Sequence, residues 1–305
     1  MPSPTDFNLS PYYDDFAESK KFHRILFRPS FAVQARELTQ SQSILQNQIE
    51  KVSDHLFEKG AMVIPGEIGY DLNYYSVKLT SFTDSAAVGV TLTDFVGLRL
   101  TGATSGVTAK VINTDATDGT DPNTLYVKYE NSGTNNTEVK FTAGETISVS
   151  TTLQSTITTV SAVVNTCHTG AAAYVGAGVY YINGFHVSVD EQTLILDKYT
   201  NTPSYRVGLS VAESFTTPND DTTLNDNATG TSNVNAPGAH RFKILLTLTK
   251  KTLTAVDDAN FVELLRLSNG IIQNQVRTTE YAVLEDTLAR RTFDESGDYS
   301  IRDFD

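Results

Sequence analysis

The sequence predicts a mainly β, multi-lobed protein with a long N-terminal α-helix, short C-terminal helices and an inserted small β-barrel or sandwich. Short runs of β-branched and aromatic residues alternate with Gly-, Asn-, Asp- and Pro-containing turns over most of the chain. One segment rich in Gln, Glu, Leu and Ala has a helical period instead. A Thr-, Gly-, Asp- and Asn-rich stretch interrupts the strand pattern, which resumes after it.

Residues 1–29 are predicted to form an extended arm. Pro2, Pro4, Pro11 and Pro29 punctuate it. Its aromatic side chains, more than a free arm should expose, are the candidate contact residues Tyr12, Tyr13, Phe16, Phe22 and Phe27. Such an arm lies either across its own subunit or across a partner, and the sequence leaves both possibilities open.

Residues 30–59 are predicted to form the helix, with Ser30 as N-cap and Gly60 as a stop. Apolar residues recur in steps of three and four, and Gln42 is the polar exception. The seam consists of Phe31, Ala35, Leu38, Gln42, Leu45, Ile49, Val52 and Leu56. This narrow stripe favours packing against another helix, with Gln42 fixing register at some cost in stability. The alternative is an amphipathic helix lying on a sheet, with Ile44 and Phe57 widening its apolar face.

Three units follow from these patterns. Residues 1–60 form a docking or oligomerisation segment, residues 84–153 an inserted small β-barrel-like domain, and residues 61–83 and 154–305 the main β-rich domain. In the insert, strands are expected at 96–100, 107–112, 125–129, 139–141 and 147–149. In the main domain, Asn183-Gly184 predicts a type I′ hairpin between strands 179–182 and 185–189.

The rest of the main domain continues this pattern. Further strands are predicted at 193–196, 206–211 and 242–249, with a long loop at 218–238. Two short helices are predicted at 257–267 and 279–291.

Composition argues against several classes of function. The net charge of -13 disfavours nucleic-acid binding, which requires clustered cations. The single cysteine, Cys167, rules out an intrachain disulfide and a cysteine-based zinc site within the chain. No signal peptide or apolar membrane span is visible, so no membrane insertion is expected.

No motif predicts an enzyme, a cofactor or a metal site. Gly176-Ala-Gly178 precedes a strand and not the helix that a dinucleotide loop needs. The aspartates at 115, 118 and 121, and those at 220, 221 and 226, lack the alternating register of an EF-type calcium loop, so turn formation explains them more simply. The five histidines show no zinc-binding spacing, and no Gly-x-Ser-x-Gly elbow is present.

Several long segments resemble a known family. These are YYDDF with the following FHRILFRPSFAVQARELTQSQSILQNQIEKVSDHLFEKGAMVIPG, then GVYYINGFHVSV, QTLILDKYTNTPSYRVGLSV, NAPGAHRFKILLTLTK and LEDTLARRTFDESGDYSIRDF. The segments resemble structural proteins of tailed bacteriophages, of the T4-like type found in phages of cyanobacteria and other marine bacteria. Such proteins are often described only as a domain of unknown function. The 84–153 module resembles small β insertions of phage virion proteins through TGATSGVTAKV and FTAGETI.

The resemblance implies a component of the virion tail, in the baseplate wedge or at the attachment of tail fibres, which is in the host cytoplasm during assembly. Expected partners are other tail and baseplate proteins, tail fibres, and further copies of the chain as a trimer or in pairs. The resemblance also suggests a chain that continues beyond Asp305. The alternative is a module that binds host-surface glycan or receptor, with Tyr126 and Tyr129 on an exposed platform; a depolymerase ranks third.

Overall fold

The computed structural model describes residues 5–81, 91–134, 136–149, 160–228, 230, 232–256, 258–276 and 283–297, and it is mainly β, as predicted. The helices of this part are α1 (Ala35–Leu56) and α2 (Val283–Ser296), with 3-10 turns η1 (Glu18–Lys20), η2 (Leu92–Phe95) and η3 (Thr222–Leu224). The strands are β1 (Met62–Ile64), β2 (Ile68–Ser81), β3 (Arg99–Gly102), β4 (Thr108–Asp115), β5 (Thr124–Asn131), β6 (Thr146–Val149), β7 (Val160–Val175), β8 (Gly178–Ile182), β9 (Phe185–Val189), β10 (Gln192–Asp197), β11 (Tyr205–Thr216), β12 (Arg241–Thr252), β13 (Phe261–Ser268) and β14 (Ile271–Gln275).

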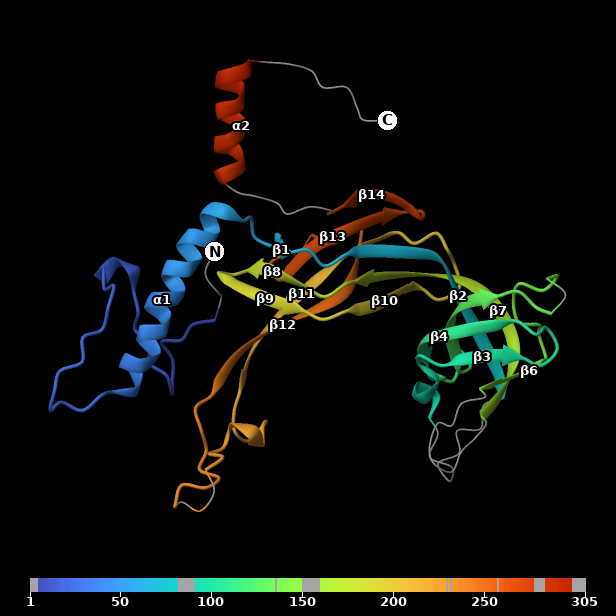
Figure 1. Cartoon of the computed structure of the whole chain (residues 1–305), viewed down its shortest axis with the longest axis horizontal. Coiled ribbons are helices and arrows are strands. Elements are labelled where there is room, and N and C mark those ends of the chain that lie inside the picture. Colours follow the sequence, from blue (N-terminus) through green and yellow to red (C-terminus); the bar gives the residue numbers. More distant parts are fainter. Residues whose placement is uncertain are drawn as a thin grey trace.

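The largest sheet closes on itself at one end of the molecule. Its strand order is β10-β7-β2-β5-β4-β3-β6, and β6 also pairs with β7, which makes a six-stranded barrel (Figure 1). Side chains that alternate inward along these strands form one core. Its buried members are Val77, Leu79, Leu92, Phe95, Leu100, Val107, Ala109, Val111, Leu125, Val127, Phe141, Ile147, Val149, Ala162 and Val164.

The main lobe contains two smaller sheets, β1-β8-β9 and β12-β11-β13-β14, beside the near ends of β2, β7 and β10. Its core draws mainly on both small sheets and on β7 and β10. Asn183 and Gly184 join β8 to β9 with φ values of 49° and 87°, so the predicted hairpin turn is confirmed. β2 and β7 pair along most of their length and run through both lobes.

Helix α1 is shorter than the predicted helix over 30–59. Its N-cap is Gln34, whose side chain accepts from the backbone N–H of Glu37 while the Glu37 side chain accepts from the N–H of Gln34. Ser30 is not the cap and has a φ of 69°. The helix ends at Leu56, and Gly60 follows with a φ of 90°, so the long N-terminal helix is corrected to 22 residues.

Two predicted elements are wrong. In the predicted helix 257–267, the described residues 258–267 do not form a helix, because β13 occupies most of them and pairs with β11 on one side and β14 on the other. The strand predicted at 139–141 is also absent, and Phe141 instead inserts into the barrel core. Local helix propensity at 261–268 is overridden by strand pairing, which buries Phe261, Leu264, Leu265 and Leu267.

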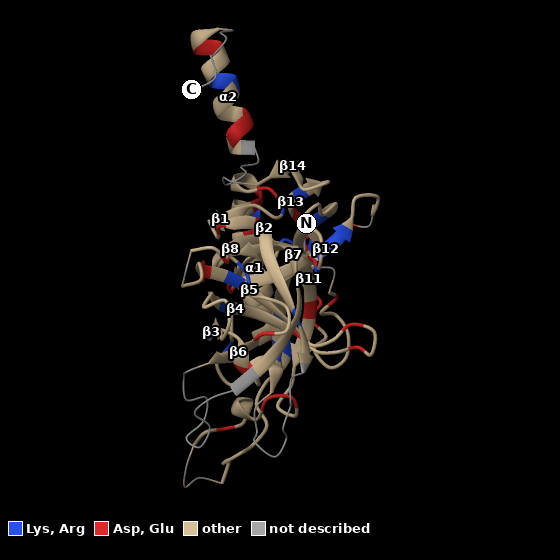
Figure 2. Ribbon diagram, turned by 90° about the vertical axis from the view of Figure 1, so that its right-hand side faces the viewer, with Lys and Arg blue, Asp and Glu red and all other residues tan. Residues whose placement is uncertain are grey.

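Helix α2 stands apart from the sheets in both views (Figures 1 and 2). It overlaps the helix predicted at 279–291, whose first four residues lie outside the described part of the chain, as does the Ile301–Asp305 end. The helix contacts α1. Among the described residues, neither helix combines the length and the hydropathy needed to span a bilayer.

Candidate docking surface

The side of α1 that faces the main lobe is attached largely by polar contacts. The Gln46 side-chain amide donates to the Gly184 carbonyl oxygen at 2.5 Å, and Ser53 Oγ lies 3.0 Å from His186 Nε2. Ile44 is the buried apolar residue of this helix. The helix is therefore oriented by a few specific hydrogen bonds and not by a broad apolar face.

A carboxylate pair lies in the same contact region. The Tyr181 hydroxyl donates to Asp54 Oδ1 at 2.6 Å, and the Phe57 ring packs beside the Tyr181 ring with centroids 6.3 Å apart. Burial, followed by the neighbouring charge of Asp54, raises the pKa of Glu50 above its usual value. The contact region between α1 and the main lobe (the joint) therefore disfavours the ionised form of Glu50.

The predicted seam of α1 lies on a neighbouring face of the helix, and its central apolar residues remain exposed. Leu38, Leu45, Ile49 and Val52 are 54%, 65%, 49% and 62% exposed. Of the other seam members, Ala35 and Gln42 are exposed and Leu56 is half-buried. Phe31 precedes the helix. The seam therefore does not lie on a sheet as the alternative expected, although the two residues that it added, Ile44 and Phe57, are buried or packed on Tyr181 of β8. Among the described residues, Gln42 of the seam lines a cleft toward the main lobe, whereas the four apolar seam residues named above remain about half or more exposed.

The arm divides into a packed part and an exposed part. The Tyr12 ring stacks on Phe215 with centroids 5.1 Å apart, and its hydroxyl lies 2.8 Å from His240 Nδ1. Phe16 is half-buried against the helix. The three remaining predicted arm residues, Tyr13, Phe22 and Phe27, are more than half exposed. Thus the arm packs on its own subunit near its start and presents aromatic surface further along.

The arm is fixed to α1 by side-chain hydrogen bonds. Ser43 donates to the buried Asp14 carboxylate, and the Gln40 amide donates to Asp15 Oδ1 at 3.1 Å. These helix residues lie away from the seam, so the arm does not cover it. Between arm, helix and the β11–β12 hairpin is a cleft of about 700 Å³ with aromatic walls and no carboxylate in its lining.

The comparisons with known proteins identify the family. A family model described as a domain of unknown function, DUF4815, matches residues 10–81 and 155–305. The chain belongs to the DUF4815 family. The match includes the arm from residue 10, the whole of α1 and most of the main lobe. It omits residues 82–154, the segment that holds β3 to β6. No curated protein and no solved structure matches the chain.

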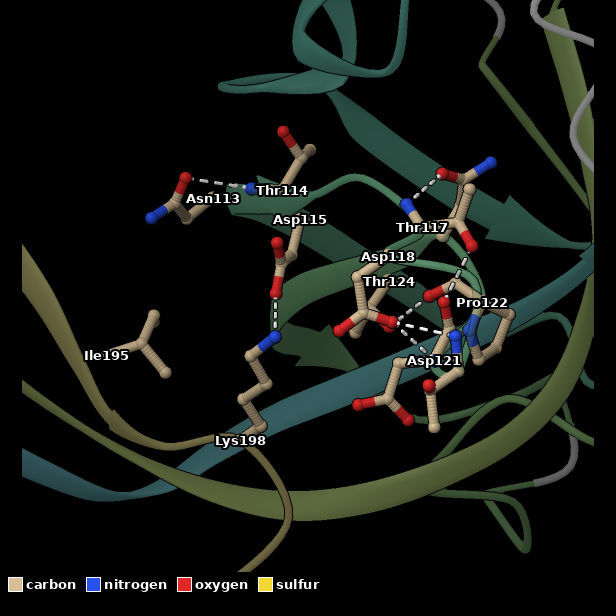
Figure 3. A network of polar contacts seen from close by, with 12 residues as sticks. Asn113, Thr114, Asp115, Thr117, Asp118, Asp121, Pro122, Thr124, Ile195 and Lys198 are labelled. Atoms are coloured by element: carbon tan, nitrogen blue, oxygen red, sulfur yellow. Dashed lines mark hydrogen bonds and ion pairs between the residues drawn. The ribbon is translucent and has the colours of Figure 1, made fainter.

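The acidic loop of this DUF4815 chain, between β4 and β5, is a turn. Asp118 Oδ1 accepts the backbone N–H of Thr120 at 2.9 Å and that of Asp121 at 2.8 Å (Figure 3). These hydrogen bonds hold the pKa of the Asp118 carboxyl below its usual value. The loop aspartates therefore serve the turn geometry expected of Asp in such sequences.

Lysines neutralise the other two aspartates of the loop. Lys198, just after β10, pairs with Asp115 (Figure 3). Lys78 on β2 lies 3.1 Å from Asp121. The Lys198–Asp115 pair thus ties the barrel to the segment after β10, whereas the Lys78–Asp121 pair joins two parts of the barrel. Asp220, Asp221 and Asp226 likewise accept hydrogen bonds from residues two or three positions away. In the described part of the chain, no group of three or more His, Cys, Asp or Glu side chains could hold a metal ion.

The tyrosines proposed as a glycan platform do not form one. Tyr126 is only 2% exposed and stacks on Tyr74 with centroids 5.8 Å apart. Tyr129 is half-buried, and its hydroxyl accepts the backbone N–H of Phe141 at 3.3 Å. Both rings pack inside the chain, so this part of the glycan-binding alternative is wrong.

Sequence periodicity identified the seam but missed the residues that orient it. Gln46, Ser53, Tyr181 and His186 hold α1 in place, and none has a distinctive local pattern. The predicted Asn183-Gly184 hairpin was the available signal for this contact region. Gln46 bonds the Gly184 carbonyl oxygen, and Ser53 lies beside the His186 ring of the same hairpin.

Proposed function

We propose that this chain is a structural subunit of a bacteriophage tail, within the baseplate, that anchors neighbouring baseplate proteins or tail fibres through its N-terminal arm and α1. The observation that carries the proposal is the open apolar seam on a helix that is already attached to the protein through a neighbouring face. An exposed apolar stripe of this kind is characteristic of an interaction surface. In this proposal the subunit is not an enzyme and acts in the virion after assembly in the host cytoplasm.

The phage assignment is supported by the family resemblance of the arm, the helix and the main-lobe segments. The docking role is supported by the arm, because exposed Phe22, Leu26 and Phe27 lie in the segment leading into the helix. Together with the seam they concentrate apolar surface between residues 22 and 52. The acidic side chains of the β4–β5 loop form hydrogen bonds and ion pairs within the chain. This fits a subunit that binds its neighbours through apolar surface.

The test is incorporation into phage particles. The gene for this chain is disrupted in a phage that normally encodes it. The host cell then supplies either the wild-type chain or the variant Leu45→Glu/Ile49→Glu. Burying two carboxylates in an apolar interface is unfavourable, so we expect at least a tenfold loss of the variant from purified tails. Val139→Glu, which alters an equally exposed apolar residue of the barrel, is the matched control and should be incorporated normally.

Quantitative immunoblotting of purified particles gives the result. Normal amounts of the double variant in tails would show that the seam is not the docking surface. Absence of the wild-type chain from particles would remove the phage assignment itself.

A further inference from the structure

The seam of α1 follows a heptad repeat over the whole helix. The first core position of each heptad is occupied by Ala35, Gln42, Ile49 and Leu56, and the second by Leu38, Leu45 and Val52. A 22-residue helix is about 33 Å long, which accommodates three heptads. A stripe repeating every 3.5 residues matches a second helix supercoiled beside it and not a flat sheet.

The positions that flank the seam are free of carboxylates and of Lys or Arg. They are occupied by Gln34, Thr39, Ser41, Gln46, Gln48, Ser53 and His55. The charged residues of α1 lie elsewhere on the helix: Arg36, Glu37, Glu50, Lys51 and Asp54. This distribution is notable in a chain with a net charge of -13, because identical copies repel one another at most of their surfaces. The seam is a face where two copies approach without like charges in contact.

The attachment of α1 leaves room for such a neighbour. The main lobe contacts the helix through Gln46, Ser53 and Asp54, and the arm contacts it through Gln40 and Ser43. Gln46 and Ser53 flank the seam on one side, and α2 also contacts the helix, but the apolar seam residues from Leu38 to Val52 remain about half or more exposed. Copies joined at their seams would therefore direct their sheets outward.

We propose that copies of this chain associate with one another through α1 in a parallel coiled coil. This inference rests on the proposed docking role of the helix. In a parallel pairing, Gln42 meets Gln42 of the other copy, so that each amide has a donor and an acceptor opposite it. In an antiparallel pairing, Gln42 would face an apolar residue of the second core position, Leu45 or Val52, and lose its hydrogen bonds on burial. The occupant of the seam is thus a further copy of the chain in the same orientation.

The first test measures mass as a function of concentration. Light scattering of the purified full chain should give two or three times 33.3 kDa at high concentration. A polar residue at a core position weakens a coiled coil, so Gln42→Leu should tighten association at least about tenfold. Leu45→Gln should weaken it at least about tenfold, and Arg36→Gln, outside the seam, should not change it. A monomer at every concentration for wild type and Gln42→Leu overturns the proposal.

The second test reports orientation. In a Cys167→Ala background, Leu38→Cys places one thiol near the start of the seam, where parallel copies bring identical residues together. Copper–phenanthroline oxidation should then give a disulfide-linked species, whereas Arg36→Cys should give little. Linkage of Arg36→Cys as efficient as that of Leu38→Cys overturns the proposed seam.

The two proposals fail differently. If the chain is monomeric but Leu45→Glu/Ile49→Glu is lost from particles, self-association is wrong and another protein occupies the seam. If the chain associates and the same variant enters particles normally, the coiled coil stands and the docking role in the tail is wrong.

Discussion

The barrel and α1 differ in how far they bury their apolar side chains. The barrel sheet closes through the β6–β7 pairing, and its core residues are at most 7% exposed. Helix α1 buries Ile44 alone among its apolar residues and leaves its heptad seam in solvent. The barrel, in which the unmatched strands β3 to β6 close on the matched strands β2 and β7, is thus complete, whereas the matched helix leaves an apolar stripe exposed among the described residues. A region whose apolar side chains are buried against one another is a self-contained module, whereas one whose apolar side chains stay exposed is a candidate interface.

The largest effect should come from the barrel core. Phe95 is fully buried on η2, and Phe95→Ala should lower the free energy of unfolding by about 3–5 kcal/mol, because it removes buried area and leaves a cavity. Chemical denaturation monitored by tyrosine fluorescence measures it. Val139→Ala, at an exposed barrel position, should change the value by no more than about 0.5 kcal/mol. Equal effects of the two would show that the barrel core is not packed as described.

A smaller loss is expected at the buried carboxylate of the barrel. Glu145 accepts the backbone N–H groups of Thr104, Ser105 and Thr142 at 3.0, 2.9 and 2.6 Å, as well as the Ser105 hydroxyl at 2.9 Å. Glu145→Gln replaces one acceptor oxygen with a donor, so unfolding should require about 1.5–3 kcal/mol less. Glu138→Gln, an exposed carboxylate of the same lobe, is the control. If the two variants unfold together, Glu145 does not organise these turns.

The stability of the contact between α1 and the main lobe should depend on pH through Glu50. Because the folded joint raises the pKa of Glu50, its contribution favours attachment at low pH and is lost as the pH rises through that pKa. Hydrogen exchange in α1, corrected for intrinsic rates, should therefore slow on mild acidification. Glu50→Gln should remove that part of the response, and Glu58→Gln, which is exposed, should keep it. A response identical in all three proteins would contradict this role of Glu50.

The smallest effect on folding should occur at the seam. Because Leu45 is mostly exposed, Leu45→Glu should alter the free energy of unfolding by no more than about 0.5 kcal/mol in dilute protein. Thermal denaturation at low concentration measures this value apart from association. A loss as large as that of Phe95→Ala would mean that the seam packs within the subunit.

The sequence predicted the elements whose signal is local. Asn183-Gly184 encodes its turn through the positive φ of both residues, and the seam spacing survives in α1. Residues 261–268 misled because Leu264, Leu265 and Arg266 favour helix in isolation, whereas one of the two strands that pair with this segment, β11, is distant in the sequence. Tyr126 misled for a related reason. A tyrosine flanked by strand residues gives no indication of which face will be covered, and here the stacking ring comes from Tyr74.

The continuity of β2 and β7 has a mechanical consequence. Strands of 14 and 16 residues extend about 45–55 Å, and their backbone pairing continues from the barrel into the main lobe, with a register irregularity between Asp71 and Tyr74. A force that pulls the barrel away along these strands loads many hydrogen bonds in shear at once, instead of peeling them one by one. The ion pair Lys198–Asp115 joins the segment after β10 to the end of β4 at the same junction. The barrel and the main lobe should therefore move as one stiff lever.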